Sequence, residues 1–364
     1  MAVDLQDPAV RRRRGDGSAL EGALRARVSG EVRFDAGSRA TYSTDASNYR
    51  EVPIGVVVPR SVEDAVAAIA VCREHGAPVL SRGGGTGLAG STTNTAVVLD
   101  WTKYCHRMVS VDAERRVAVV EPGMALDPLN DQLAAHGLKV GPKPATHVSC
   151  SIGGMIGNNS CGSTAQAYGK MVDSVRRLEV LTYDGLRCWV GPTDDEEYER
   201  IVAAGGRRAE LYRGLRRLRD EYADDIRERY PDIPRRVSGY NLDSLLPEKG
   251  LDVAKALVGS ESTLVTVLRA EIDLFPTRSG AALVVLGYPD IVAAARDVPA
   301  VLEYGPSALE GVDQRLVDLE RRESLSLEAL AQLPQGEAWL LVQFAGDDPG
   351  GGRPRRPGHG RGVR

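Results

Sequence analysis

Two glycine-rich segments, far apart in the chain, constrain this sequence more than any other feature. The first covers residues 82–90 and reads RGGGTGLAG, and the second covers residues 151–162 and reads SIGGMIGNNSCG. Glycine loses more backbone entropy on folding than any other residue, so such density is tolerated mainly where the main chain turns sharply or lies against something bulky. The two segments therefore predict loops that hold a large, phosphate-bearing ligand.

The first segment contains a G-x-G-x-x-G pattern, formed by Gly85, Gly87 and Gly90. In the usual dinucleotide-binding folds such a pattern opens a helix whose N-terminus faces the diphosphate. Here residues 91–95 are typical of a turn and residues 96–100 of a β-branched strand, and no Gly-Lys-Ser/Thr follows the glycines, which excludes a P-loop. We predict a strand, a loop and another strand, with phosphates bound by main-chain N–H groups and by Arg82. A glycine-rich hairpin without a ligand is the alternative.

The second segment adds hydrogen-bonding side chains to its glycines. They are Asn158, Asn159, Ser160 and Ser163, with Tyr168, Gly169 and Lys170 just beyond. A ring system with many hydrogen-bonding edges, stacked on a flat stretch of backbone, would use this arrangement. An ordinary turn built from asparagine and glycine is the alternative interpretation.

Short motifs occur in a fixed order along the chain: VVVP at 56–59, RGGGTG at 82–87, IGG at 152–154, NNSCG at 158–162, YG at 168–169, GYNL at 239–242 and GSESTL at 259–264. In this order they resemble FAD-linked oxidases of the vanillyl-alcohol oxidase and p-cresol methylhydroxylase (PCMH) type. The resemblance is strongest to the D-lactate and D-2-hydroxyglutarate dehydrogenase branch, especially the large bacterial members that fuse a flavin half to an iron–sulfur half. It extends from about residue 42 to about residue 346.

This resemblance implies an α+β fold, in which a PCMH-type FAD-binding domain with two subdomains precedes the start of a ferredoxin-like α/β cap. It implies FAD as the cofactor, held without a covalent bond because no histidine matches a tethering position. The residues that it assigns to the cofactor are Arg82, Gly83, Gly84, Gly85, Thr86, Gly87, Leu88, Ser151, Gly153, Gly154, Asn158, Ser160, Gly162, Tyr168, Gly169, Glu261, Thr263 and Val265. Where the family usually has a second glycine, in Gly-Ser-Glu-Gly-Thr, this chain carries Ser262.

The same resemblance, with changes in composition, predicts four regions. Residues 1–40 form a partly disordered N-terminal leader, 41–276 the FAD-binding domain, 277–346 a partial cap and 347–364 a tail. The tail is too rich in Gly, Pro and Arg to build a core. Because the composition breaks abruptly within the cap, we expect a truncation or an altered reading frame there.

The sequence also indicates where several helices and strands lie. Ser61 with Asp64 is typical of a capped helix start, and a second helix is expected between Asp127 and Gly137. The charged stretch 194–230 predicts a pair of surface helices. Strands are expected at 55–58, 79–81, 96–99, 108–112, 116–121, 179–183 and 187–190, and the cap is expected to contain a strand at 282–287, a helix at 291–304 and a strand at 338–344.

Composition sets limits on partners and location. With 364 residues and 42% apolar residues the chain can form two domains, and a net charge of -4 gives no global attraction to nucleic acid. No apolar run approaches the ~20 residues of a membrane-spanning helix. Five cysteines show no C-x-x-C spacing and leave one unpaired in any disulfide scheme, so we expect reduced thiols and a cytoplasmic protein.

The chemistry implied by the resemblance is hydride transfer from a D-2-hydroxy acid, such as D-lactate or D-2-hydroxyglutarate, to the flavin. It needs a base that works near neutral pH and a cation for the carboxylate. In the family these groups come from the later cap, so His147 and Arg236 are only weak candidates, each with a structural alternative. No histidine pair has metal-ligand spacing, and Glu310 and Asp313 are expected to be structural.

Two functional hypotheses follow. The first is an FAD-dependent D-2-hydroxyacid dehydrogenase that passes electrons to a separate iron–sulfur or quinone-linked partner. The second is an FAD-binding module that is catalytically incomplete because the cap and the electron-exit half are missing. A glycine-rich interaction domain without catalysis is a third, and it alone predicts no bound FAD.

Overall fold

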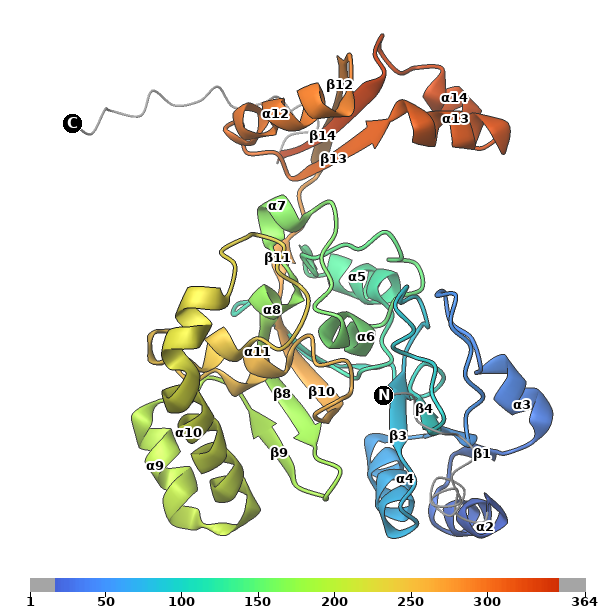
Figure 1. The fold of residues 1–364 in the computed structure, drawn as a ribbon, viewed down its shortest axis with the longest axis vertical. Helices are drawn as coiled ribbons and strands as arrows, with labels where there is room; N and C mark the ends of the chain where they lie inside the picture. Colours follow the sequence, from blue (N-terminus) through green and yellow to red (C-terminus); the bar gives the residue numbers. More distant parts are fainter. Residues whose placement is uncertain (1–16, 347–364) are drawn as a thin grey trace. The chain divides into compact units, whose positions relative to one another are not determined.

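The computed structural model describes residues 17–346, which form two compact units. The first unit runs to Val140 and also contains Thr146–Ser160 and Lys170–Phe275. The second contains Gly141–Ala145, Cys161–Gly169 and the chain from Pro276 onward. Figure 1 labels the elements of both units, which we describe separately.

The first unit contains a four-stranded sheet in the order β1-β2-β4-β3. Its strands are β1 (Glu31–Arg33), β2 (Gly55–Val58), β4 (Val97–Asp100) and β3 (Val79–Arg82). The last three are parallel, and every residue of β2 and β4 is buried, as expected for central strands covered on both faces. The helices of this part are α2 (Gly17–Arg27), α3 (Ala36–Thr41) and α4 (Val62–Glu74).

Helix α4 begins where the sequence predicted. The side chain of Ser61 accepts a hydrogen bond from the main-chain nitrogen of Asp64, which satisfies one of the free N–H groups of the first turn. Helices α2 and α4 lie side by side in Figure 1, and Leu24 and Ile69 bury their side chains in one core with the sheet. Residues 17–40 were expected to belong to a partly disordered leader, but they form α2, β1 and part of α3 because they carry this buried apolar face.

The larger sheet of the first unit is antiparallel, with the order β5-β6-β10-β8-β9. Its strands are β5 (Met108–Asp112), β6 (Val117–Val120), β10 (Thr266–Asp273), β8 (Val175–Leu181) and β9 (Arg187–Val190). Burial alternates along β10, so one face meets the core and the other does not. The helix predicted between Asp127 and Gly137 is present as Leu126–Ala134, and its Leu129 and Leu133 are fully buried in this core.

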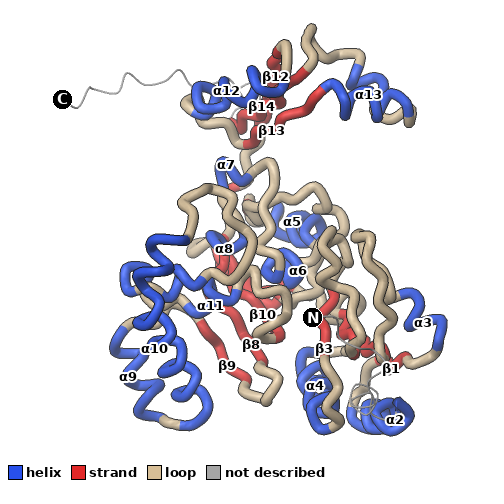
Figure 2. The backbone as a smooth tube through the Cα atoms, viewed as in Figure 1, coloured by secondary structure: helices blue, strands red, loops and turns tan. Residues whose placement is uncertain are grey.

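Several helices accompany this sheet. They are α5 (Leu126–Ala134), α6 (Ile152–Gly157), α8 (Met171–Ser174), α9 (Asp195–Ala204), α10 (Gly206–Arg229) and α11 (Val253–Leu257), with the 3-10 turns η1 (Leu242–Leu245) and η2 (Pro247–Lys249). Figure 2 shows α9 and α10 packed side by side, as predicted for residues 194–230. The buried residues of α10 are Ala209, Tyr212 and Ile226. Two further short strands are β7 (Leu138–Lys139) and β11 (Phe275–Pro276).

The second unit is a three-stranded antiparallel sheet with helices. Its elements are α7 (Ala165–Tyr168), β12 (Gly280–Tyr288), α12 (Ile291–Leu302), β13 (Ala308–Asp313), α13 (Gln314–Arg322), α14 (Leu327–Leu330) and β14 (Ala338–Gly346). The predicted strand, helix and strand correspond to β12, α12 and β14, whereas β13 and α13 had no prediction. Asp313 is structural as expected, since its carboxylate caps α13 by accepting from the nitrogen of Leu316.

Two predicted regions cannot be compared with the structure. The tail at 347–364 and the first part of the leader lie outside the described residues. All five cysteines lie within them and form no disulfide bond with one another. Within 17–346, none of the helices is both long and apolar enough to cross a bilayer.

Candidate functional site

The first glycine segment connects two neighbouring parallel strands. β3 ends at Arg82, β4 begins at Val97, and residues 83–96 between them contain no helix, as the sequence predicted. Parallel neighbours need a crossover, which is usually helical, and here a glycine loop replaces it. Within the loop Gly85 and Gly90 have φ values of +65° and +76°, a backbone conformation that favours glycine.

The second glycine segment forms the short helix α6, which the sequence did not predict. Ser151 is its N-cap, because its Oγ accepts a hydrogen bond from the nitrogen of Gly154 at 3.2 Å. Gly153 allows this helix to approach the preceding segment, since a Cβ atom there would lie 2.7 Å from the Pro122 Cβ. The glycines thus permit close packing inside a helix as well as in a turn.

The two glycine segments meet in space. A Cβ atom on Gly83 would lie 2.0 Å from the Ser151 Oγ, and one on Gly84 would lie 2.0 Å from the carbonyl oxygen of Ser149. The main chain at Gly83 and Gly84 therefore contacts residues 149–151, and a side chain at either glycine would clash. This confirms the expectation that the two distant segments converge.

A third segment, residues 259–265, joins the same place. The nitrogen of Gly259 donates to the Ile156 carbonyl at 2.9 Å, and the nitrogen of Glu261 donates to the Gly157 carbonyl at 3.1 Å. Glu261 and Ser262 have φ values of +48° and +64°, which side chains rarely adopt. The second family glycine thus corresponds to a position where this chain holds a serine in a left-handed conformation.

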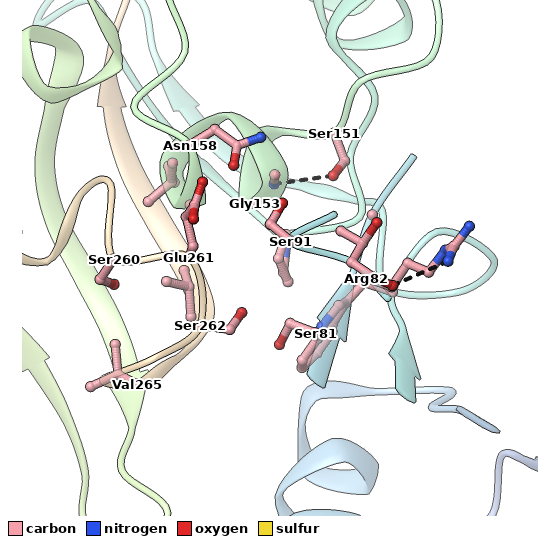
Figure 3. Close-up of a pocket in the computed structure, with 18 of the residues that line it drawn as sticks. Ser81, Arg82, Ser91, Ser151, Gly153, Asn158, Ser260, Glu261, Ser262 and Val265 are labelled. Carbon is pink, nitrogen blue, oxygen red and sulfur yellow. Dashed lines mark hydrogen bonds between the residues drawn. The ribbon is translucent and has the colours of Figure 1, made fainter. Parts of the chain in front are cut away.

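These three segments surround one cavity of the first unit (Figure 3). Its walls are formed by Ser81, Arg82, Gly83, Ser91, Thr92, Trp101, Pro122, Ser151, Gly153, Gly154, Ile156, Gly157, Asn158, Leu257, Ser260, Glu261, Ser262, Val265 and Val267. The lining is mainly main chain, hydroxyl groups and apolar surface. Such a wall suits a ligand that carries a diphosphate, sugar hydroxyls and flat rings.

Arg82 was expected to bind a phosphate with its side chain, but the guanidinium has other partners. It donates to the carbonyl oxygens of Tyr42 at 3.4 Å, Thr92 at 3.2 Å and Thr44 at 2.8 Å. It also lies 5.3 Å from the centre of the Tyr42 ring. Figure 3 shows the side chain directed away from Glu261 and Ser262 on the opposite wall.

The carboxylate of Asp45 lies behind the glycine loop. It accepts hydrogen bonds from the Thr92 hydroxyl at 2.7 Å and from the Ser47 nitrogen at 2.9 Å. Burial raises the pKa of Asp45, but these hydrogen bonds outweigh burial and hold the pKa below its usual range. Asp45 is therefore an anion near neutral pH.

Comparison with known proteins identifies a domain within the first unit. Residues 53–191 match a family model described as an FAD binding domain. The chain is 30% identical over 340 residues to D-2-hydroxyglutarate dehydrogenase of Pseudomonas putida, and 31% identical over 296 residues to D-lactate dehydrogenase of Archaeoglobus fulgidus. This chain carries an FAD binding domain. The resemblance drawn from the motifs is confirmed.

The matches differ in how much of each protein they cover. The alignment takes in 91% of this chain but 34% of the Pseudomonas protein, and 80% of this chain but 54% of the Archaeoglobus protein. The chain thus spans about a third to a half of the length of these relatives. A solved alkyldihydroxyacetonephosphate synthase superimposes with a TM-score of 0.63 and 15% identity, covering 90% of this chain and 56% of that one, which shows a shared fold. The predicted α+β FAD-binding fold is confirmed.

Features of the cavity fit FAD. Ser81 and Trp101 line it, and the Ser81 Oγ and Trp101 Nε1 atoms are buried without a hydrogen-bond partner. Buried polar atoms are rarely left unpaired, so these two mark where a polar ligand belongs. The glycine contacts at Gly83 and Gly84 leave backbone, rather than side chains, along the adjoining wall.

The cofactor residues expected from the sequence fall into three groups. Those that line the cavity are Arg82, Gly83, Ser151, Gly153, Gly154, Asn158, Glu261 and Val265. Those that belong to the same segments without lining it are Gly84, Gly85, Thr86, Gly87, Leu88, Ser160 and Thr263. Those that belong to the second unit are Gly162, Tyr168 and Gly169.

Sequence reasoning missed Ser81 and Trp101. Ser81 belongs to β3, and Trp101 directly follows β4. Because the carboxyl ends of parallel strands meet at one edge of a sheet, where ligands of α/β folds commonly bind, the predicted strand ends were an available signal.

The weak catalytic candidates are outside the cavity wall. The His147 Nδ1 lies 2.7 Å from a carboxylate oxygen of Asp127, in the first turn of α5. The Arg236 guanidinium donates to the Asp243 carboxylate at 2.6 Å and lies 4.7 Å from the centre of the Tyr230 ring. These contacts favour the structural alternative for both side chains. Among the residues 17–346, no cluster of three or more His, Cys, Asp or Glu is placed to hold a metal ion.

Proposed function

We propose that this chain is the flavin-binding part of an oxidoreductase that oxidises a D-2-hydroxy acid and passes the electrons to a separate acceptor. The observation that carries the proposal is the convergence of three distant segments on one cavity, in a chain with an FAD binding domain. The substrate class follows from relatives named for D-2-hydroxyglutarate and D-lactate.

Each of the three segments would bind a different part of FAD. The main chain of residues 82–88, of which Arg82 and Gly83 line the cavity, would hold the diphosphate, and α6 with Asn158 would lie along the flavin. The Glu261 carboxylate suits sugar hydroxyls, since an anion disfavours a neighbouring phosphate and accepts hydrogen bonds from hydroxyl groups. Bound FAD supplies the acceptor for the hydride.

Oxidation of a 2-hydroxy acid removes a hydride from the α-carbon and a proton from the hydroxyl, leaving a 2-oxo acid. The proton needs a base, and the substrate carboxylate needs a cation. Among the described residues that line the cavity there is no histidine, and Arg82 is the one cation, already bonded to three carbonyls. The described part of the chain therefore supplies the cofactor site more fully than the substrate site.

The lack of a histidine and of a free cation among the described cavity-lining residues favours a second hypothesis, an FAD-binding module without complete catalytic groups. Under the dehydrogenase hypothesis electrons leave to another protein, for which we propose an iron–sulfur or quinone-linked acceptor.

The test is spectroscopic. The purified chain is reconstituted with FAD, and D-lactate or D-2-hydroxyglutarate is added without oxygen, with the L-enantiomers as controls. Loss of the oxidised flavin absorbance with the D-acids alone supports the dehydrogenase. A flavin spectrum that stays oxidised supports the module, and a chain that does not bind FAD contradicts both.

A further inference from the structure

The glycine loop is fastened from behind by residues 42–47, which we call the strap. Arg82, at the start of the loop, donates to the strap carbonyls of Tyr42 and Thr44. The strap nitrogen of Ala46 donates to the Gly85 carbonyl at 2.9 Å. At the far end Asp45 accepts from the Thr92 hydroxyl at 2.7 Å and from the Thr92 nitrogen at 3.4 Å.

These contacts fix both ends and the middle of a loop rich in glycine. Such a loop without a fastening would sample many conformations, and its N–H groups would have to be ordered again by each ligand. Arg82 bonds to both sides at once, since it also donates to the Thr92 carbonyl at 3.2 Å. A lysine has the same charge but cannot reproduce this fork of planar donors.

The side chains of Arg82 and Asp45 are not arranged to bind a phosphate directly. The Arg82 guanidinium is bonded to carbonyls and stacked on Tyr42. The Asp45 carboxylate would repel a diphosphate held in the loop, yet it is bonded to Thr92 of that loop and does not line the cavity. These contacts do not favour electrostatic attraction of a phosphate by either side chain. They favour a role in holding the glycine loop rigid.

We infer that Arg82 and Asp45 are positioning residues, which hold the strap against the glycine loop so that its main-chain amides are preorganised for the diphosphate. The inference rests on the proposed FAD site and replaces the direct contact between Arg82 and phosphate that the sequence suggested. In this arrangement the diphosphate is bound by main-chain N–H groups, and Arg82 acts through its hydrogen bonds to the strap and to the loop.

The experiment titrates FAD into the apo form of the whole chain and follows the quenching of flavin fluorescence. The Arg82→Lys and Arg82→Ala variants are expected to lose affinity to a similar extent, about tenfold or more, because both break several hydrogen bonds. A direct phosphate contact predicts instead that Arg82→Lys stays close to the unmodified chain while Arg82→Ala falls, and that result would overturn the inference. Arg217→Lys, at an exposed position on α10, is the matched control and should bind normally.

At Asp45, electrostatic repulsion and positioning predict opposite changes in the affinity for FAD. Asp45→Ala removes a negative charge near the diphosphate, so electrostatics alone predicts tighter binding. Positioning predicts binding about tenfold weaker, from the lost Thr92 and Ser47 hydrogen bonds. Asp45→Asn keeps an acceptor oxygen and is expected to restore most of the affinity. Equal or tighter binding by Asp45→Ala would overturn the inference.

Folding and the proposed function are separated by two controls. Circular dichroism of each apo variant shows whether the fold persists. If the alanine variants unfold, the FAD affinities of Arg82→Lys and Asp45→Asn still test the inference. Failure of the unmodified chain to bind FAD rejects the proposed function. Binding by the unmodified chain, with unchanged affinity in Arg82→Lys and Asp45→Ala, rejects the positioning role alone.

Discussion

A Cβ atom added to Gly83 would lie 2.0 Å from the Oγ atom of Ser151, 68 positions later in the sequence. This Oγ is already engaged, since it accepts the hydrogen bond that caps α6. The cap of one cavity segment is thus packed against the backbone of another. The site depends on glycine at position 83 because the main chain there lies directly against Ser151, with no space for a side chain.

Gly84 offers the sharpest test of this contact, because the neighbour is a main-chain atom that cannot rotate away. The Gly84→Ala variant is expected to lose bound FAD, since its Cβ would lie 2.0 Å from the Ser149 carbonyl oxygen. Flavin content after reconstitution measures the effect. Gly214→Ala, in α10 with no atom within 4 Å of the new Cβ, should retain FAD and gain about 0.5–1 kcal/mol of stability. Equal flavin content in the two variants would contradict the packing.

Ser262 is expected to carry backbone strain at the cavity wall. Its φ of +64° is costly for any residue with a Cβ atom, so Ser262→Gly should raise the free energy of unfolding by about 1 kcal/mol. Ser262→Ala keeps the Cβ and should change it by less than about 0.5 kcal/mol. Urea unfolding of the apo forms provides the measurement. A glycine variant no more stable than the alanine variant would refute the strain.

Glu31 should make folding stability depend on acid pH. Hydrogen bonds from Lys103, Arg33 and Tyr104 lower the pKa of Glu31 from 4.5 to about 2. A lowered folded-state pKa stabilises the protein above the unfolded pKa, and this contribution is lost as pH falls from about 4.5 toward 2. Glu31→Gln should therefore be less stable near neutral pH, by up to about 1 kcal/mol for a partly exposed ion pair. Urea midpoints should converge with those of the unmodified chain near pH 2, and a constant difference would argue against this pairing.

Ser61 caps α4, and its removal should destabilise the four-stranded sheet that the helix covers. Ser61→Ala is expected to lower the free energy of unfolding by about 1 kcal/mol, because the Asp64 nitrogen loses its acceptor. The control is Ser110→Ala on the exposed strand β5, which should change stability by less than about 0.5 kcal/mol. Thermal unfolding distinguishes the two variants, and equal melting temperatures would show that the cap is dispensable.

Local patterns predicted most of the elements around the site. The Ser61 cap, the strand at 108–112 and the charged helix pair each follow from short-range preferences, and each is present. The helix α6 was missed because glycine disfavours helices, and the close approach of Pro122 and Gly83 that stabilises this one comes from distant residues. Likewise, the strand β13 lies between predicted elements, and β14 pairs with it along its length.

The sequence by itself predicted that two glycine segments and the motif at 259–264 serve one large ligand, because glycine density and motif order can be read from the chain without its structure. The tertiary structure alone decided which atoms meet. It directed the Arg82 guanidinium to three carbonyls instead of the cavity and placed Trp101 in the wall. It also put Ser262 in a left-handed conformation. These outcomes depend on contacts between residues far apart in the chain, and side-chain direction is set by such packing rather than by neighbours in sequence.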